Sequence, residues 1–241
     1  MTAILSNGAD IGLVGPETTL YVYAQGANDP VKSFAQLTQT DGTFLVARNQ
    51  KGTFNWDQLR NTTFLGQRVG GMPQMVGEYV LSKHGIDPHN DLNLIQNIDF
   101  ANLANAYASG TGDYVQLFEP TASIMEKEGK GTIVASFGLE SGKVPYTAFM
   151  AKESYLKKNA KTVQKFTDAL YEAQQWVDSH SAEEIAKSVA PFFKDTPLDI
   201  SIKVIDRYKS QNSYSTNPIL EEDEWNNLQN IMKNSGELPK E

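Results

Sequence analysis

The chain has 241 residues, of which 40% are hydrophobic, so it can form one large domain or two lobes of about 100 residues each. Its formal net charge of −8 argues against a general binder of nucleic acids or anionic membranes, because phosphate binding requires a basic field. The absence of cysteine excludes disulfides, thiolate metal sites, iron–sulfur clusters and a cysteine nucleophile.

The first predicted element is a strand that runs directly into a helix. Residues 11–14 are apolar, Gly15 permits a tight turn, and Pro16 suits the first position of a helix. Open α/β sheets bind ligands at the carboxyl ends of strands, often against a helix N-terminus. We therefore expect Gly15, Glu17 and Thr18 to contact a ligand. The alternative role of Glu17 and Thr18 is ordinary helix capping and dipole compensation.

Two further strands are predicted at 33–37 and 44–48, on either side of a turn at 40–43. In this turn the Asp-Gly pair is expected to supply a residue with positive φ. Asp41 is a candidate ligand residue, and its alternative role is that of a turn residue only.

From residue 64 onward, strand and helix signals alternate regularly. Apolar residues at helical spacing predict helices, and short apolar runs between them predict strands. Four strands joined by three crossover helices predict a parallel sheet. The expected order is strand 64–68, helix 73–83, strand 92–96, helix 100–109, strand 114–118, helix 120–128 and strand 132–137.

Three junctions in this block repeat the pattern of a strand followed by glycine or polar residues and a helix start. Because parallel strands end at the same edge of a sheet, these junctions are expected to face a common ligand. The alternatives are a tight turn at the glycines and helix capping by the aspartate. The candidate ligand residues are Gly70, Gly71, Met72, Asp99, Phe118 and Glu119.

A loop with two glycines is expected at 138–145, followed by a strand at 146–151. Tyr146 could stack on a ligand ring, although it could also simply be packed. The rest of the chain is predicted to be almost entirely helical, with helices at 160–179, 181–189, 198–209 and 221–233.

Several segments occur in a characteristic order along the chain. They are residues 5–12 followed by Gly15-Pro16-Glu17, residues 44–48, residues 56–60, the Gly-Gly-Met-Pro junction at 70–73, residues 113–120 and the helical tail. In this order they resemble the substrate-binding proteins of ABC importers for nitrate, sulfonates, taurine and thiamine precursors. The resemblance covers nearly the whole chain.

The resemblance implies a two-lobe α/β fold of the periplasmic-binding-protein type II, in which each lobe is a mainly parallel sheet flanked by helices and the C-terminal tail is all helical. Lobe I would comprise residues 1–47 and 148–241, and lobe II residues 48–147. The family holds its ligand in a cleft between the lobes, closes about hinges and delivers the ligand to membrane subunits. Such a protein would act in the periplasm or lipid-anchored outside the cytoplasmic membrane, and it would need no cofactor or metal.

One departure from the family concerns the first residues. Family members begin with an export or lipoprotein signal, then a strand, a helix and a second strand, before the segment that matches residues 9–12. These elements do not occur here. The departure would leave the strand at 11–14 as an exposed apolar edge, which predicts pairing of two copies or aggregation.

The charges of the candidate residues indicate the type of ligand. Four candidates are carboxylates, whereas the strong cation near them is Arg68. A nitrogen-rich or cationic heterocycle, such as a thiamine or pyrimidine precursor, is therefore favoured over a sulfonate or nitrate. A helix N-terminus can nevertheless bind an anion without any arginine or lysine.

Two other classes of protein share the implied fold. Thiamine-pyrimidine synthases carry a cysteine-rich motif, which a chain without cysteine cannot have. The three histidines, His84, His89 and His180, form no evident zinc set, and no common catalytic motif occurs. The effector domain of a transcription regulator would need a DNA-binding segment, and the acidic balance supplies no basic patch. The sequence thus predicts a receptor without catalysis and without a nucleic-acid partner.

Overall fold

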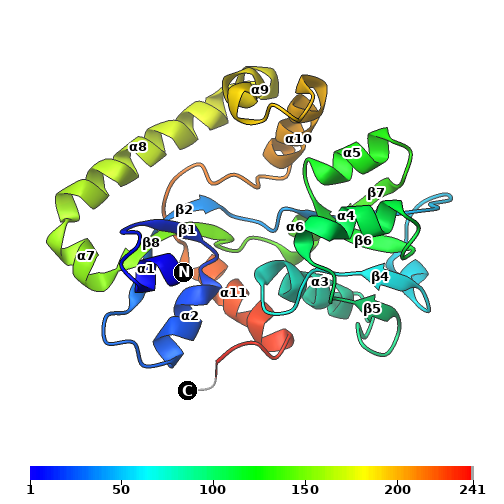
Figure 1. Ribbon diagram of the computed structural model, residues 1–241, viewed down its shortest axis with the longest axis horizontal. Coiled ribbons are helices and arrows are strands. Elements are labelled where there is room, and N and C mark those ends of the chain that lie inside the picture. Colours follow the sequence, from blue (N-terminus) through cyan, green and yellow to red (C-terminus); the bar gives the residue numbers. More distant parts are fainter. Residues whose placement is uncertain (240–241) are drawn as a thin grey trace. The chain divides into compact units, whose positions relative to one another are not determined.

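The computed structural model describes residues 1–239, which form two units built from separate stretches of the chain (Figure 1). The chain passes from one unit to the other at four places, after residues 40, 142, 181 and 211. Unit 1 comprises Met1–Thr40, Lys143–Ser181 and Asn212–Glu241, and unit 2 comprises Asp41–Gly142 and Ala182–Gln211.

The sheet of unit 1 has three strands in the order β1-β8-β2, and both outer strands run antiparallel to β8. One face is covered by the first two helices, where Ile4 and Val22 pack with Val31 and Met150. The strands are β1 (Gly12–Val14), β2 (Val31–Thr38) and β8 (Thr147–Lys152), and the two helices are α1 (Thr2–Leu5) and α2 (Glu17–Ala24).

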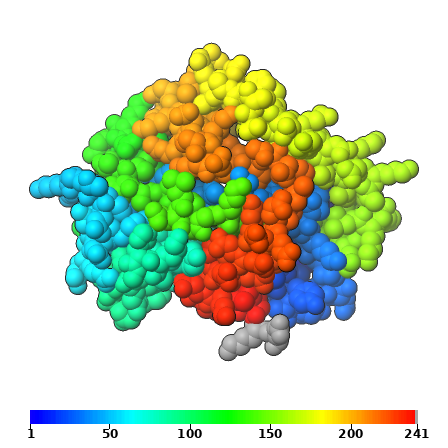
Figure 2. Space-filling model, turned by 180° about the vertical axis from the view of Figure 1, so that it is seen from behind, coloured from blue at the N-terminus to red at the C-terminus, as the bar shows by residue number. Residues whose placement is uncertain are grey.

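The long helix α8 (Ala160–Ser179) packs on the same sheet through one aromatic side chain. The ring of Phe166 lies 6.0 Å from that of Phe34 on β2 and 4.8 Å from that of Phe149 on β8. Because Phe149 and Met150 are neighbours on a strand, their side chains point to opposite faces. Elsewhere α8 lies on the surface, as Figure 2 shows in yellow-green, and Gln174 is its one buried residue. The other helices of unit 1 are α7 (Glu153–Lys158) and α11 (Glu222–Asn234).

The sheet of unit 2 has five strands in the order β5-β4-β6-β3-β7. Strand β4 pairs in parallel with β5 and β6, whereas β3 lies antiparallel between β6 and β7. The core beside this sheet includes Phe44, Leu65, Leu103, Tyr107 and Val115. The strands are β3 (Thr43–Ala47), β4 (Thr63–Leu65), β5 (Asn93–Ile95), β6 (Tyr114–Phe118) and β7 (Thr132–Ser136).

The helices of unit 2 connect these strands and return after residue 181. They are α3 (Met72–Lys83), α4 (Phe100–Ala108), α5 (Thr121–Lys127), α6 (Phe137–Ser141), α9 (Ala182–Val189) and α10 (Leu198–Ser210), with short 3₁₀ turns at Trp56–Leu59 and Ala190–Phe192. Within residues 1–239, no helix combines the length and the apolar character that a membrane crossing requires.

The predicted strand and helix order is confirmed, but the predicted sheet pairing is wrong in two respects. The last strand of the regular block, β7, does not follow β6 in the sheet, because β3 is inserted between them. Every residue of β3 is buried, and a strand buried on both faces belongs in the middle of a sheet. The second error concerns unit 1, for which a mainly parallel sheet was expected. Its strand pairs are all antiparallel.

Two predicted connections also differ. Residues 40–43 do not form a hairpin turn, because β2 and β3 belong to different sheets and Gly42 does not adopt positive φ. The expected loop at 138–145 begins instead with the helix α6. Its N-cap is Ser136, whose Oγ accepts a hydrogen bond from the Leu139 N–H at 3.3 Å, and Gly142 ends it with φ of 78°.

The unit boundaries fall a few residues from the expected ones, and residues 182–211 lie with unit 2 although they were expected in lobe I. Contacts within unit 2 explain this placement. Lys127 and Glu126 of α5 form ion pairs of 2.7 and 2.6 Å with α10, and the hydroxyl of Tyr208 donates to the Gly42 carbonyl at 2.7 Å.

The strand β1 lies at an edge of its sheet, and Leu13 in it is 46% exposed. An exposed apolar edge of this kind can pair with another chain. Pairing of two copies along β1 therefore stays a prediction.

Candidate functional site

The predicted site residues of unit 2 gather at one edge of its sheet. Strands β4, β5 and β6 are parallel, so the residues that follow them leave the sheet at the same edge. Strand β3 runs the other way and begins there, since Thr43 pairs with Phe118. The edge therefore collects Asp41, Gly70, Gly71, Met72, Asp99, Phe118 and Glu119.

The predicted site residues of unit 1 also share an edge. Val14 at the end of β1 pairs with Ala148, and Thr38 at the end of β2 pairs with Thr147. Both strands thus end beside the start of β8. This edge collects Gly15, Glu17, Thr18 and the buried Tyr146, whose N–H donates to the Thr38 carbonyl at 3.0 Å.

The polar groups of the junction between β1 and α2 mostly bond to one another. The N–H and the hydroxyl of Thr18 both donate to the Gly15 carbonyl, at 3.1 and 2.7 Å. Thr19 bonds to the Pro16 carbonyl in the same way, at 3.0 and 2.7 Å. An anion at this junction would therefore meet donors that already have partners, so the junction is poorly suited to a nitrate or sulfonate.

The remaining polar group of this junction is the carboxylate of Glu17. The residue is 6% exposed, and its Oε2 has no hydrogen-bond partner. The carboxylate folds back over Gly15, because a Cβ atom at that glycine would collide with the carboxylate of Glu17. Burial raises the pKa of Glu17 from 4.5 to about 7, against the opposing effect of its own backbone N–H. The junction thus offers one carboxylate oxygen, Oε2, that lacks a donor.

The glycine junction of unit 2 is held by a network of buried amides. Gly70 is exposed with φ of 96°, and its N–H donates to Gln74 Oε1 at 3.1 Å. Gln74 and Gln96 each donate to Glu78 Oε1 at 2.8 Å. Met72 is 2% exposed and packs inside, so the glycines are the accessible part of this junction.

Sequence reasoning missed a second amide network at the same edge. Gln116 in the middle of β6 donates to Thr43 Oγ1 and to the Pro73 carbonyl, both at 2.8 Å. Gln67 donates to the Gln116 carbonyl at 2.7 Å. The available signal was a glutamine between apolar residues of a buried strand, since a buried amide requires partners. These bonds position the starts of β3 and α3.

The most exposed part of the unit 2 edge is aromatic and charged. Phe100 is 65% exposed, and its ring lies 5.9 Å from that of Phe118 with the planes at 58°. Asp99 is the N-cap of α4 but makes no side-chain cap bond. Its carboxylate lies 3.9 Å from Arg68, and both side chains are about three-quarters exposed. Phe100 was not predicted as a site residue.

Two predicted carboxylates are already engaged by protein donors. Asp41 is buried, and its Oδ1 accepts bonds from the N–H and the hydroxyl of Thr43. Glu119 exposes none of its side chain, accepts two bonds of 2.9 Å from Ser123, and pairs with Arg207 of α10. Both carboxylates therefore stabilise the edge itself.

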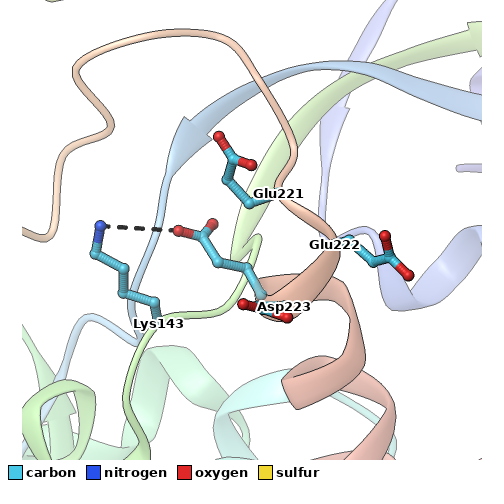
Figure 3. A pocket seen from close by; sticks show the side chains of 5 residues that line it. Lys143, Glu221, Glu222 and Asp223 are labelled. Atoms are coloured by element: carbon cyan, nitrogen blue, oxygen red, sulfur yellow. Dashed lines mark ion pairs between the residues drawn. The ribbon is translucent and has the colours of Figure 1, made fainter.

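A hollow in unit 1 contains none of the predicted site residues (Figure 3). Its acids are the N-cap residue and the first turn of α11, where they compensate the helix dipole. The carboxylate of Glu224 lies 3.8 Å from Lys143 Nζ and accepts a bond of 2.8 Å from Gln36. Its lining residues are Lys143, Glu221, Glu222, Asp223 and Glu224.

The histidines near residue 85 bond to separate partners. His84 Nε2 lies 2.8 Å from Glu140, and His89 Nε2 lies 3.4 Å from Glu78. In the part of the chain that the structure describes, no group of three or more histidine, aspartate and glutamate side chains is arranged to hold a metal ion.

The chain has known relatives in sequence and in structure. Residues 1–191 match the profile of a family described as the NMT1-like family. The protein named "Putative binding protein YtlA" of Bacillus subtilis (strain 168) is 68% identical over 240 residues, which is 100% of this chain and 72% of that protein.

Two solved structures have a similar fold. The alkanesulfonate-binding protein SsuA from Xanthomonas axonopodis pv. citri, bound to MOPS, matches with a TM-score of 0.75 and 18% identity, over 99% of this chain and 80% of that chain. The periplasmic nitrate-binding protein NrtA from Synechocystis PCC 6803 matches with a TM-score of 0.65 and 18% identity, over 96% of this chain and 67% of that chain. The expected α/β periplasmic-binding-protein fold is thereby confirmed.

Proposed function

We propose, since this chain belongs to the NMT1-like family, that it is the substrate-binding receptor of an ABC import system. Its 68% identity to a protein named as a binding protein supports this role, and so does the fold that it shares with receptors for alkanesulfonates and nitrate. The prediction that the protein is not an enzyme is confirmed, because its family and structural neighbours are binding proteins.

This role places the protein outside the cytoplasmic membrane, where it captures a small molecule and presents it to the membrane subunits of an importer. We propose the periplasm or a lipid anchor on the outer face of that membrane as its location. The periplasmic relative for nitrate supports this assignment.

We propose further that the ligand is a nitrogen-rich or cationic heterocycle, such as a thiamine or pyrimidine precursor. The observation that carries this proposal is the exposed ring of Phe100 beside Phe118 and the carboxylate of Asp99. An aromatic face stacks on a planar ring and attracts a cation, while a carboxylate accepts bonds from ring N–H or amino groups. A sulfonate or nitrate is the alternative, and the exposed Arg68 is the residue that favours it.

A thermal-shift screen tests the ligand class. Thiamine precursors, flavins, sulfonates, taurine and nitrate are compared, because a ligand that binds only the native state raises stability by mass action. We expect a thiamine or pyrimidine precursor to raise the melting temperature. A shift with sulfonates or nitrate alone, abolished by Arg68→Ala, would show that the heterocycle proposal is wrong.

Replacing Phe100 by alanine is expected to weaken binding of the ligand found in that screen by about tenfold, the contribution of one stacked ring. The measurement is titration calorimetry of both proteins. Phe192→Ala is the matched control, since that ring is 84% exposed in the same unit but lies in the 3₁₀ turn between α9 and α10 and follows no strand. Equal losses in both variants, or none in Phe100→Ala, would remove the stacking role.

A further inference from the structure

The Oε2 oxygen of Glu17 lacks a donor although it is buried. Its residue is 6% exposed, Oε2 has no hydrogen-bond partner, and the neighbouring threonine groups bond to carbonyls of the same turn. A buried acceptor without a donor is unfavourable, and a buried charge without a partner is more so. A ligand donor that forms a hydrogen bond to this oxygen, at the carboxyl end of a strand, would therefore bind with a large gain in free energy.

The titratable groups near Glu17 in the described part of the chain supply no positive charge. Tyr21 lies one turn further along α2, and its buried hydroxyl also has no hydrogen-bond partner. Burial, then Glu237 beyond α11, and then Glu17 itself raise the pKa of Tyr21 to about 12. Among residues 1–239, no lysine, arginine or histidine forms an ion pair with Glu17, and burial raises its pKa to about 7. The carboxyl group therefore exchanges its proton close to neutral pH.

The two protonation states of Glu17 differ in what they require. The neutral acid can remain folded against Gly15, where the absence of a Cβ leaves room for it. The carboxylate requires a donor for Oε2, and the turn has none to give beyond the backbone N–H of Glu17, because the N–H and hydroxyl groups of Thr18 and Thr19 are already bonded. A donor nitrogen on a ligand at this edge would supply the missing bond.

We propose that Glu17 is a proton-linked acceptor that selects a ligand with a donor nitrogen, such as an amidinium or an aminopyrimidine. On capture the carboxyl O–H bond breaks, the proton passes to water, and a ligand N–H donates to the resulting carboxylate. The inference rests on the proposed receptor function and extends it by naming the group that recognises the ligand. Because only the ionised Glu17 accepts this bond, the affinity for the ligand should increase as the pH rises through neutrality.

Calorimetric titration with two probes of one ring size tests the proposal. Benzamidine is cationic at both pH values and carries donor nitrogens, whereas benzenesulfonate is an anion without donors. Benzamidine is expected to bind wild type about 30-fold more tightly at about pH 8 than at about pH 5.5, because only the ionised acceptor binds it. Titrations in buffers of different ionisation enthalpy should show release of a proton. Glu17→Gln should lose both the pH dependence and the proton release.

Glu172→Gln is the control, since it makes the same change on the exposed surface of α8 in the same unit and should behave like wild type. Equal pH dependence in wild type and Glu17→Gln would overturn the proposal, as would tighter binding of benzenesulfonate at acid pH, which would make Glu17 a donor to anions. If neither probe binds at any pH, the proposed ligand class is wrong, and so is the proposed link between ligand binding and proton release. The infrared band of a protonated carboxyl group near neutral pH, present in wild type and absent in Glu17→Gln, decides the proton site separately.

Discussion

Replacing Arg207 by methionine is expected to lower the free energy of unfolding by about 3 to 5 kcal/mol, because it leaves a buried carboxylate without its counter-ion. That carboxylate belongs to Glu119, whose side chain has no exposed surface. Arg207 also lies 5.2 Å from the centre of the Phe44 ring and donates to Ser123 at 3.2 Å, so it joins α10 to the core of unit 2. Urea unfolding of the purified variant measures the loss.

A second substitution separates the unpaired charge from the lost packing. Adding Glu119→Gln to the Arg207 variant removes the unpaired charge and keeps an acceptor for Ser123, so most of the stability should return. Lys203→Met is the control on the same helix, because its ion pair with Glu126 is half-exposed and should contribute at most about 1 kcal/mol. A double variant no more stable than Arg207→Met alone would show that packing, and not charge, dominates.

Glu17→Gln is expected to stabilise the protein at about pH 8 and to have little effect at about pH 4. The folded-state pKa is raised from 4.5 to about 7 by burial, so the folded protein keeps a proton that the unfolded chain loses between those values. Stability present below 4.5 is therefore lost as the pH rises through 7. The pKa shift corresponds to a loss of roughly 3 kcal/mol in the free energy of unfolding. The Glu17→Gln variant does not undergo this loss, because an amide does not titrate.

Urea unfolding of wild type and Glu17→Gln across this pH range measures the difference between their stabilities. The difference should grow in favour of the variant between about pH 5 and pH 8 and then remain constant. A difference that does not change with pH would mean that a donor reaches Glu17 in solution. If Glu17 binds the ligand as proposed, its destabilising effect on the empty protein is an instance of the trade-off between stability and function.

Local sequence patterns predicted the order of strands and helices and the places where strands end. Gly15-Pro16 and Met72-Pro73 mark two strand-to-helix junctions because glycine and proline have strong backbone preferences. The positions of candidate residues at two sheet edges follow from those junctions. The tail helices were predicted because their apolar residues repeat at helical spacing.

Pairings between distant residues could not be predicted in this way. The insertion of β3 between β6 and β7 joins residue 44 to residues 117 and 136, and no local periodicity records such a contact. The ion pair of Glu119 could not be predicted either, because its partner Arg207 lies 88 residues further along the chain. The 65% exposure of Phe100 could not be predicted, because it depends on which distant parts of the chain pack against the ring.

The four passages of the chain between the units bear on how the protein is made. Unit 1 buries Leu228, Ile231 and Met232 completely, so its core cannot close until the ribosome has delivered α11. The core cluster of unit 2 lies within residues 44–125, and α10, with its ion pairs to α5, is added after a stretch of unit 1. Domains usually fold in order as they emerge, and contacts that join distant residues form slowly. Unit 1 can therefore be completed only when nearly the whole chain has been made, and a single proteolytic cut after residue 142 or 181 would divide both units.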